Sequence, residues 1–415
     1  MELGKNTKAN FSWNMIGSIF ESALSFVLLI AVNRIMGESS GGIFTLAFSH
    51  AQLMYYIGTL EVRPLQSTDV RQKYPFSSYF SLRLVSCAVM IAACLAYALA
   101  MNADPLKKSV VMYVCLYKTI EAVMDSFTAM YQQHDRIEYG GKLSVFRVSL
   151  TLAAFIGTLL LTHRLEYACI AMLAAGLVTL FTYNLFFWKK FPDAKIRPDF
   201  RYMKEILISC FPLFVSVFVM LYISNAPKYA IDEYCTDVIQ NRYSILFMPA
   251  FVINLFSQFV FRPLLTTMAK IWNNGEAKRF LSNILKMLAG ILALTLLGLL
   301  GAWLLGIPIL KLLYNVDVEQ DKTILLWVMI YGGLNAVNIF LYNMVAITRR
   351  QKWLLIGYIA AALTIFVLAP SMVQQYEMTG AIISSIVSIA LLDTVLAIII
   401  SIVIRNRLRA DKEEA

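Results

Sequence analysis

Long runs of apolar residues alternate with short polar connections from one end of the chain to the other. A bilayer core about 30 Å thick needs about 20 apolar residues of α-helix, and many of these runs approach or exceed that length. The pattern therefore predicts an all-α polytopic membrane protein with about twelve transmembrane helices. The expected spans are 12–36, 42–62, 79–101, 108–131, 143–162, 166–188, 205–224, 241–262, 284–307, 322–346, 353–371 and 379–404.

The longest polar connection, residues 189–204, divides the expected spans into two sets of six. We expect an N-terminal six-helix bundle over 1–190, a cytoplasmic linker over 191–204, and a C-terminal six-helix bundle with a short cytoplasmic tail over 205–415. When the N-terminus is placed in the cytoplasm, most Lys and Arg residues of the connections fall on that side. Cytoplasmic loops carry an excess of basic residues, so both termini are expected in the cytoplasm.

The composition argues against several classes of protein. Of the 415 residues, 59% are apolar and 15% are charged, and the basic residues behind the net charge of +10 lie between apolar runs. This placement argues against a nucleic-acid partner. No connection is long enough for a catalytic or nucleotide-binding domain, and the sequence contains no GxxxxGK[ST] phosphate loop. We therefore expect no enzymatic activity.

The six cysteines and three histidines do not have the sequence spacing of a metal site or of a catalytic constellation. Most of the cysteines fall in apolar runs, where they are typical small buried side chains. The sequence therefore predicts neither a metal nor a cofactor.

One apolar run is interrupted by ionisable residues at helical spacing. Lys118, Glu121 and Asp125 lie at i, i+3 and i+7 on one face, which Thr128 and Gln132 extend. An ionisable group at the bilayer centre costs about 2.5–3.5 kcal/mol on insertion scales, so it usually faces a partner or a cavity. One interpretation is a Lys118–Glu121 ion pair that only locks two spans together. The other is a polar stripe that lines a water-filled cavity, and it also accounts for the remaining carboxylate.

Other expected spans carry polar residues as well: Glu21 and Arg34 in the first, Asn335 and Asn338 in the tenth, and Asp393 in the twelfth. Helix–helix hydrogen bonding is the alternative interpretation for the small polar residues among them. A carboxylate in a low-dielectric cavity can change its protonation state, which suits coupling to a proton or cation gradient.

Arg83 and Arg147 are expected about one turn inside the cytoplasmic ends of their spans. Their alternative interpretation is snorkelling of the side chain to the membrane interface. If they face the interior, Arg and Lys suit a phosphate or diphosphate, while amide side chains suit sugar hydroxyls.

Three segments go beyond physical pattern: LYKTIEAVMDSFTAMYQQHDRIEYGGKLSVFR at 116–147, the stretch 211–265 with its NAPKYAID and FMPAFVINLFSQFVFRPLL runs, and EVRPLQSTD at 61–69. They resemble the polysaccharide-transporter flippases of the multidrug/oligosaccharidyl-lipid/polysaccharide exporter superfamily. The resemblance implies two six-helix bundles around a central cavity. It also implies transfer of an undecaprenyl-diphosphate-linked oligosaccharide from the inner to the outer leaflet of the bacterial cytoplasmic membrane. Transfer would proceed by alternating access, coupled to a proton or sodium gradient.

The resemblance and the embedded charges together give the expected site. The expected substrate-binding residues are Arg34, Arg63, Arg83, Lys118, Arg147, Lys228, Asn335 and Asn338. The expected ion-coupling residues are Glu21, Glu121, Asp125, Asp232 and Asp393. The expected partners are the lipid-linked oligosaccharide, H⁺ or Na⁺, membrane lipids and the polysaccharide polymerase machinery. Two other functions stay open: a multidrug or cation antiporter of the same superfamily, and a membrane polysaccharide polymerase.

Overall fold

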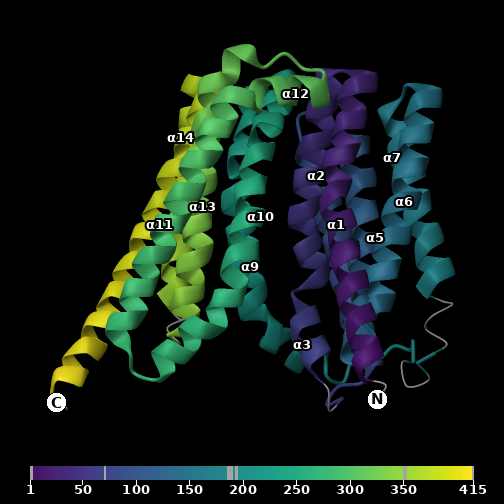
Figure 1. Ribbon diagram of the computed structural model, residues 1–415. Coiled ribbons are helices and arrows are strands. Elements are labelled where there is room, and N and C mark those ends of the chain that lie inside the picture. Colours follow the sequence, from purple (N-terminus) through teal and green to yellow (C-terminus); the bar gives the residue numbers. More distant parts are fainter. Residues whose placement is uncertain (1–2, 70–71, 185–189, 192–194, 349–352, 414–415) are drawn as a thin grey trace. The chain divides into compact units, whose positions relative to one another are not determined.

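The computed structural model describes residues 3–69, 72–184, 190–191, 195–348 and 353–413, and the regular elements of this part of the chain are all helical (Figure 1). The helices of the first half are α1 (Leu3–Met36), α2 (Glu38–Thr59), α3 (Val62–Thr68), α4 (Phe76–Ala100), α5 (Pro105–Gln133), α6 (Ile137–Thr162) and α7 (Leu165–Thr179). Those of the second half are α9 (Met203–Tyr234), α10 (Asp237–Asn273), α11 (Ala277–Gly301), α12 (Ile307–Tyr314), α13 (Lys322–Ile347) and α14 (Leu354–Glu413). A π-helical turn, Leu180–Asn184, continues α7, and another, Ala302–Gly306, joins α11 to α12.

Eight helical stretches of the described chain are long and apolar enough to cross a membrane, by length and composition. They are Asn10–Met36, Phe76–Ala100, Ile137–Thr162, Leu165–Thr182, Met203–Tyr234, Ala277–Tyr314, Glu319–Ile347 and Leu354–Arg409. The last bends at Glu377, whose φ of 47° and ψ of −127° are not helical. Helix α5 is not among the eight, although the expected polar stripe lies on it. The structure thus confirms an all-α, multi-pass membrane protein, whereas twelve crossings stay a prediction.

The chain forms two compact units, Met1–Phe218 and Val219–Ala415, and the division falls within α9. The bundle boundaries expected around 191–204 and the central cavity between the bundles stay predictions.

In the first unit, α5 packs against α2, α3, α4, α6 and α7, and α1 packs along α6. Small residues allow α1 and α6 to approach closely. A Cβ atom added at Gly141 would overlap the carbonyl group of Trp13, and one added at Gly17 would lie 2.9 Å from backbone atoms of Gly141. Such close backbone contact is typical of small residues at membrane helix interfaces. It brings the side chains of α1 within reach of those on α6.

Asn10 connects α1 to the first turn of α6, at the end of the helix pair that is expected to face the cytoplasm. Its side-chain amide donates to the carbonyl of Asp135 at 2.9 Å, and its side-chain oxygen accepts from the backbone N–H of Glu138 at 3.1 Å. The N–H of Glu138 belongs to the first turn of α6, where backbone donors have no partner within the helix. Asn10 therefore sets the register of α1 against α6.

The connection before α9 is anchored to the start of α4. Asp199 accepts hydrogen bonds from Ser77 at 3.1 Å and from Arg201 at 2.9 Å, and its backbone N–H donates to Ser81. The Arg201 guanidinium holds the pKa of Asp199 well below its usual range, so this carboxylate is charged at neutral pH.

In the second unit, α13 packs against α10, α11 and α14.

Candidate functional site

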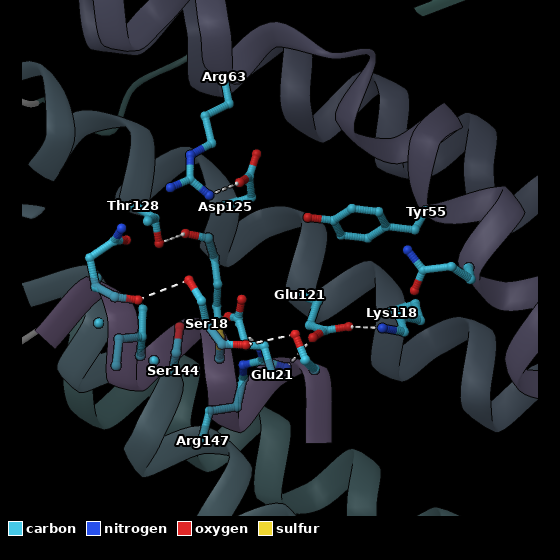
Figure 2. A pocket seen from close by; sticks show the side chains of 18 residues that line it. Ser18, Glu21, Tyr55, Arg63, Lys118, Glu121, Asp125, Thr128, Ser144 and Arg147 are labelled. Carbon is cyan, nitrogen blue, oxygen red and sulfur yellow. Dashed lines mark hydrogen bonds and ion pairs between the residues drawn. The ribbon is translucent and has the colours of Figure 1, made fainter. Parts of the chain in front are cut away.

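A cavity of about 320 Å³ lies within the first unit, between α1, α2, α5 and α6 (Figure 2). Its wall also includes Arg63 from α3. Most of the side chains that line it are charged or polar, in contrast to the apolar composition of the chain as a whole. The complete lining consists of Asn14, Ser18, Glu21, Ser22, Gln52, Tyr55, Arg63, Lys118, Glu121, Met124, Asp125, Thr128, Leu143, Ser144 and Arg147, together with three glycines.

Arg147 on α6 lines this cavity and contacts residues of both α1 and α5. Its Nη2 atom lies 2.9 Å from Oε1 of Glu21 on α1, and its Nη1 atom forms an ion pair with Glu121 on α5. Nη1 also donates to the hydroxyl of Tyr117 at 3.0 Å. The Arg147 side chain is 5% exposed whereas that of Glu21 is 48% exposed. Because a buried charge needs a partner, the carboxylates of Glu21 and Glu121 balance the charge of this guanidinium.

Lys118 completes this group of charges. Its Nζ atom lies 2.6 Å from Oε2 of Glu121, and it also faces the rings of Phe48 and Tyr55 at 4.7 Å and 5.8 Å from their centroids. Glu121 is therefore held between two cations, Lys118 and Arg147. Figure 2 shows these three side chains pointing toward one another from two helices.

Asp125 organises a second group of charges one turn further along α5. Its Oδ2 atom lies 3.0 Å from Nη2 of Arg83, and its Oδ1 atom lies 3.2 Å from Nη1 of Arg63. Arg83 is 1% exposed and also donates to the carbonyl of Gly58 at 3.0 Å, whereas Arg63 is 37% exposed. Arg63 further donates to Gln132 at 3.4 Å. Arg83 thus anchors Asp125 from behind, and Arg63 covers it from the open side.

A second cavity of about 480 Å³ adjoins the first. The two share Tyr55, Arg63 and Asp125, so the Arg63–Asp125 ion pair lies where one cavity meets the other.

These contacts decide between several interpretations of the sequence. The Lys118–Glu121 ion pair exists, but both residues belong to α5 and line a cavity, so this pair alone does not lock two spans together. That water fills the cavity stays a prediction. Asp125, which a Lys118–Glu121 pair alone would leave without a counter-ion, has two. Arg83 and Arg147 are buried in the protein, so the snorkelling interpretation is wrong for both.

Seven of the expected site residues do not line this cavity. One of them, Arg83, pairs with Asp125 from the protein interior. Arg34 is exposed in the last turn of α1. The others belong to the second unit: Lys228 and Asp232 are half-buried on α9, and Asn335 is half-buried on α13. The remaining two are Asn338 and Asp393.

Asn338 and Asp393 meet inside the second unit. The side-chain amide of Asn338 on α13 donates to Oδ1 of Asp393 on α14 at 3.0 Å, and both residues are buried. The Oδ2 atom of Asp393 is buried too and has no hydrogen-bond partner among the described residues. The sequence placed these two residues in different roles, whereas the structure makes them one pair.

Sequence reasoning missed several residues of the site, including Tyr55, Tyr117 and Ser144. Ser144 donates to Glu21 at 2.6 Å and precedes Arg147 by one helical turn, and that spacing was the available signal. Tyr117 directly precedes Lys118, but its hydroxyl reaches Arg147 only because α5 and α6 cross there.

The structure also brings together a cluster that the sequence spacing does not indicate. The ligand atoms of His50 on α2, Cys94 on α4 and Cys115 on α5 lie within 4.8 Å of one another, and all three residues are buried. The prediction of no metal, which was made from sequence spacing, stays a prediction. Helix packing, not local spacing, makes the cluster.

Three solved transporter structures share the fold. A multidrug resistance MATE family transporter of the MOP superfamily, in an inward-facing conformation, aligns over 95% of this chain and 98% of its own with a TM-score of 0.70 and 11% identity. The lipid II flippase MurJ, in an inward closed conformation, aligns over 95% and 91% with a TM-score of 0.70 and 14% identity. A MOP superfamily transporter from Pyrococcus furiosus aligns over 96% of both chains with a TM-score of 0.56 and 14% identity. At such identities the likeness shows the fold alone.

No curated protein matches the chain by sequence. The sequence model of one family does match, over residues 7–272, which is more than half of the 415 residues and contains the whole charged cavity. The chain belongs to the polysaccharide biosynthesis protein family, and its fold is that of the MOP superfamily transporters.

Proposed function

We propose that this protein is a flippase that moves a diphosphate-linked lipid oligosaccharide from the inner to the outer leaflet of the bacterial cytoplasmic membrane. Transfer proceeds by alternating access and is coupled to a proton or sodium gradient. Both termini lie in the cytoplasm. Membership of the polysaccharide biosynthesis protein family and the fold shared with a lipid II flippase support this assignment.

The observation that carries the proposal is the charged cavity of the first unit. Three cations and three carboxylates line it in two ion-paired groups, and Arg83 holds Asp125 from the protein interior. A polar head group cannot cross hydrocarbon unaided, because each unpaired polar group costs several kcal/mol there. A polar cavity within a helical unit offers such a group hydrogen bonds and charge while its lipid tail stays in the bilayer.

The ion pairs suggest how substrate and gradient are linked. Glu121 and Glu21 compete with a diphosphate for the same cation, Arg147. Protonation of either carboxylate, or its binding of a cation, weakens its hold on Arg147 and leaves that residue to the phosphate oxygens. Arg binds phosphate in two-point fashion, whereas Lys118 supplies a point charge. The buried Asn338–Asp393 pair gives the second unit its own group that responds to a proton or cation.

Surface polysaccharide in a strain that depends on this protein tests the proposal. Lys118→Gln removes a cavity cation, and Arg164→Gln removes an exposed cation away from the cavity. We expect at least a tenfold loss of polymer with the first variant and wild-type polymer with the second, at equal protein in the membrane. Equal polymer from both variants would contradict the cavity's role.

A multidrug or cation antiporter is the second candidate, and Glu21 is the observation in its favour, because it is a half-exposed carboxylate that a cationic drug could reach. The lining argues against it, since Met124 and Leu143 are the only aliphatic or thioether side chains among the described residues that form it. Growth with cationic dyes separates the two functions: an antiporter raises the tolerated concentration and a flippase does not.

A further inference from the structure

A groove of about 440 Å³ lies in the second unit, between the first turns of α11 and the last turns of α14. Three cations stand around it, Lys278 on α11 and Arg405 and Arg409 on α14. Its apolar wall is made by Leu281, Ile404 and Leu408. The groove belongs to neither the charged cavity of the first unit nor the Asn338–Asp393 pair.

The cations of this groove are available for a ligand. Within the described part of the chain, Lys278, Arg405 and Arg409 form no ion pair and no hydrogen bond, and all three are exposed. Their neighbours differ: Arg279 pairs with Glu276 at 2.8 Å, and Arg407 lies over the ring of Trp272. Three positive charges therefore converge on one groove, and no counter-ion for them is found among the described side chains.

The position of the groove defines the chemistry that fits it. Two candidate membrane spans, Ala277–Tyr314 and Leu354–Arg409, have their ends here, so we expect the groove to lie where lipid head groups meet hydrocarbon. The amino-terminal end of α11, which carries the positive end of the helix dipole, adds to the attraction for an anion. Basic pockets beside membrane helices bind anionic head groups. The apolar wall gives an acyl chain a surface to lie on, which a free anion would not use.

We infer that this groove binds one anionic phospholipid, its phosphate held by Lys278, Arg405 and Arg409 and one acyl chain lying along Leu281, Ile404 and Leu408. The site is a resident lipid site and not part of the transport route. The inference does not depend on the proposed function.

Native mass spectrometry of the purified protein tests it with three probes: phosphatidylglycerol, phosphatidylcholine and inorganic phosphate. The test variant carries Lys278→Gln, Arg405→Gln and Arg409→Gln. The control variant loses the same charge at exposed positions outside the groove, through Arg164→Gln, Arg279→Gln and Lys286→Gln. We expect one phosphatidylglycerol per chain to bind the wild type and the control, and at least tenfold weaker binding to the test variant.

Other results would overturn the inference. Equal loss in the control variant would indicate a general charge effect, equal binding of phosphatidylcholine would remove the role of the cations, and competition by inorganic phosphate would indicate a free-anion site. If the test variant does not fold, a salt titration of the wild type decides instead. Phosphatidylglycerol binding should weaken as NaCl rises while phosphatidylcholine binding does not, and parallel curves would contradict the site.

Discussion

Arg147 on α6 lies 2.9 Å from the carboxylate of Glu21 on α1 and pairs at the same time with Glu121 on α5. One buried guanidinium thus links three helices and two acidic residues. A ligand that binds the Arg147 guanidinium must displace the carboxylate of Glu21 or Glu121. The same ion pairs therefore matter for stability and for ligand binding.

Removing this guanidinium should separate its two roles. Arg147→Gln leaves Glu121 with Lys118 as its remaining counter-ion, and breaking a buried pair costs about 3–5 kcal/mol of unfolding free energy. The double variant Arg147→Gln/Glu121→Gln removes both charges and should recover most of that stability. Transport should stay at least tenfold below wild type in both variants, because the cation itself is missing.

Thermal unfolding in detergent and surface polysaccharide measure the two effects. If the double variant regains transport along with stability, Arg147 is a structural residue only.

The Arg83–Asp125 pair should behave differently. Arg83 is buried behind Asp125 and contacts the Gly58 carbonyl, so it holds the helices and does not face the cavity. Arg83→Gln should destabilise the protein by about 3 kcal/mol or more, and Arg83→Gln/Asp125→Asn should restore part of the loss. Unfolding midpoints of the three proteins measure it, and a single variant as stable as the wild type would contradict the contact.

The approach of α1 to α6 should control the site from a distance. Gly141→Ala places a methyl group against the backbone of Trp13, which pushes α1 away and lengthens the Glu21–Arg147 contact. Gly157→Ala is the matched control on the same helix, because nothing lies within 4 Å of its added methyl group. Polysaccharide export should fall with the first variant and stay normal with the second; equal export would show that the close approach is not required.

Asp393 should carry the response of the second unit to the gradient. Asp393→Asn keeps the size of a buried side chain that accepts from Asn338 but removes its ionisable group. We expect transport in proteoliposomes to lose its dependence on an imposed gradient, with Thr394→Ala, an exposed neighbour on α14, as the control. A variant that still responds to the gradient as the wild type does would exclude this residue from coupling.

The sequence predicted the elements better than the site. Lys118, Glu121 and Asp125 share a helix face because helical periodicity is local, and the structure confirms it. The partners of these residues come from other helices, and nothing local specifies that Glu21 meets Arg147. That contact depends on Gly17 and Gly141, whose lack of side chains is visible in the sequence but whose pairing is not.

Because local sequence patterns do not specify contacts between helices, several expected site residues lie outside the charged cavity. Lys228 and Asn335 look like cavity residues by composition, yet they belong to the other compact unit. Asn338 and Asp393 are far apart in sequence, and only the packing of α13 on α14 joins them. His50, Cys94 and Cys115 converge for the same reason.

The central claim, that the cavity around Arg147 passes a diphosphate-bearing lipid, is tested most directly by leaflet transfer in proteoliposomes. A fluorescent diphosphate-linked lipid oligosaccharide is placed in one leaflet, and its accessibility to a membrane-impermeant quencher is followed over time. The account predicts rapid transfer by the wild type, at least tenfold slower transfer by Arg147→Gln/Glu121→Gln, and wild-type transfer by Gly157→Ala. Transfer at the wild-type rate by the folded Arg147→Gln/Glu121→Gln variant would contradict it.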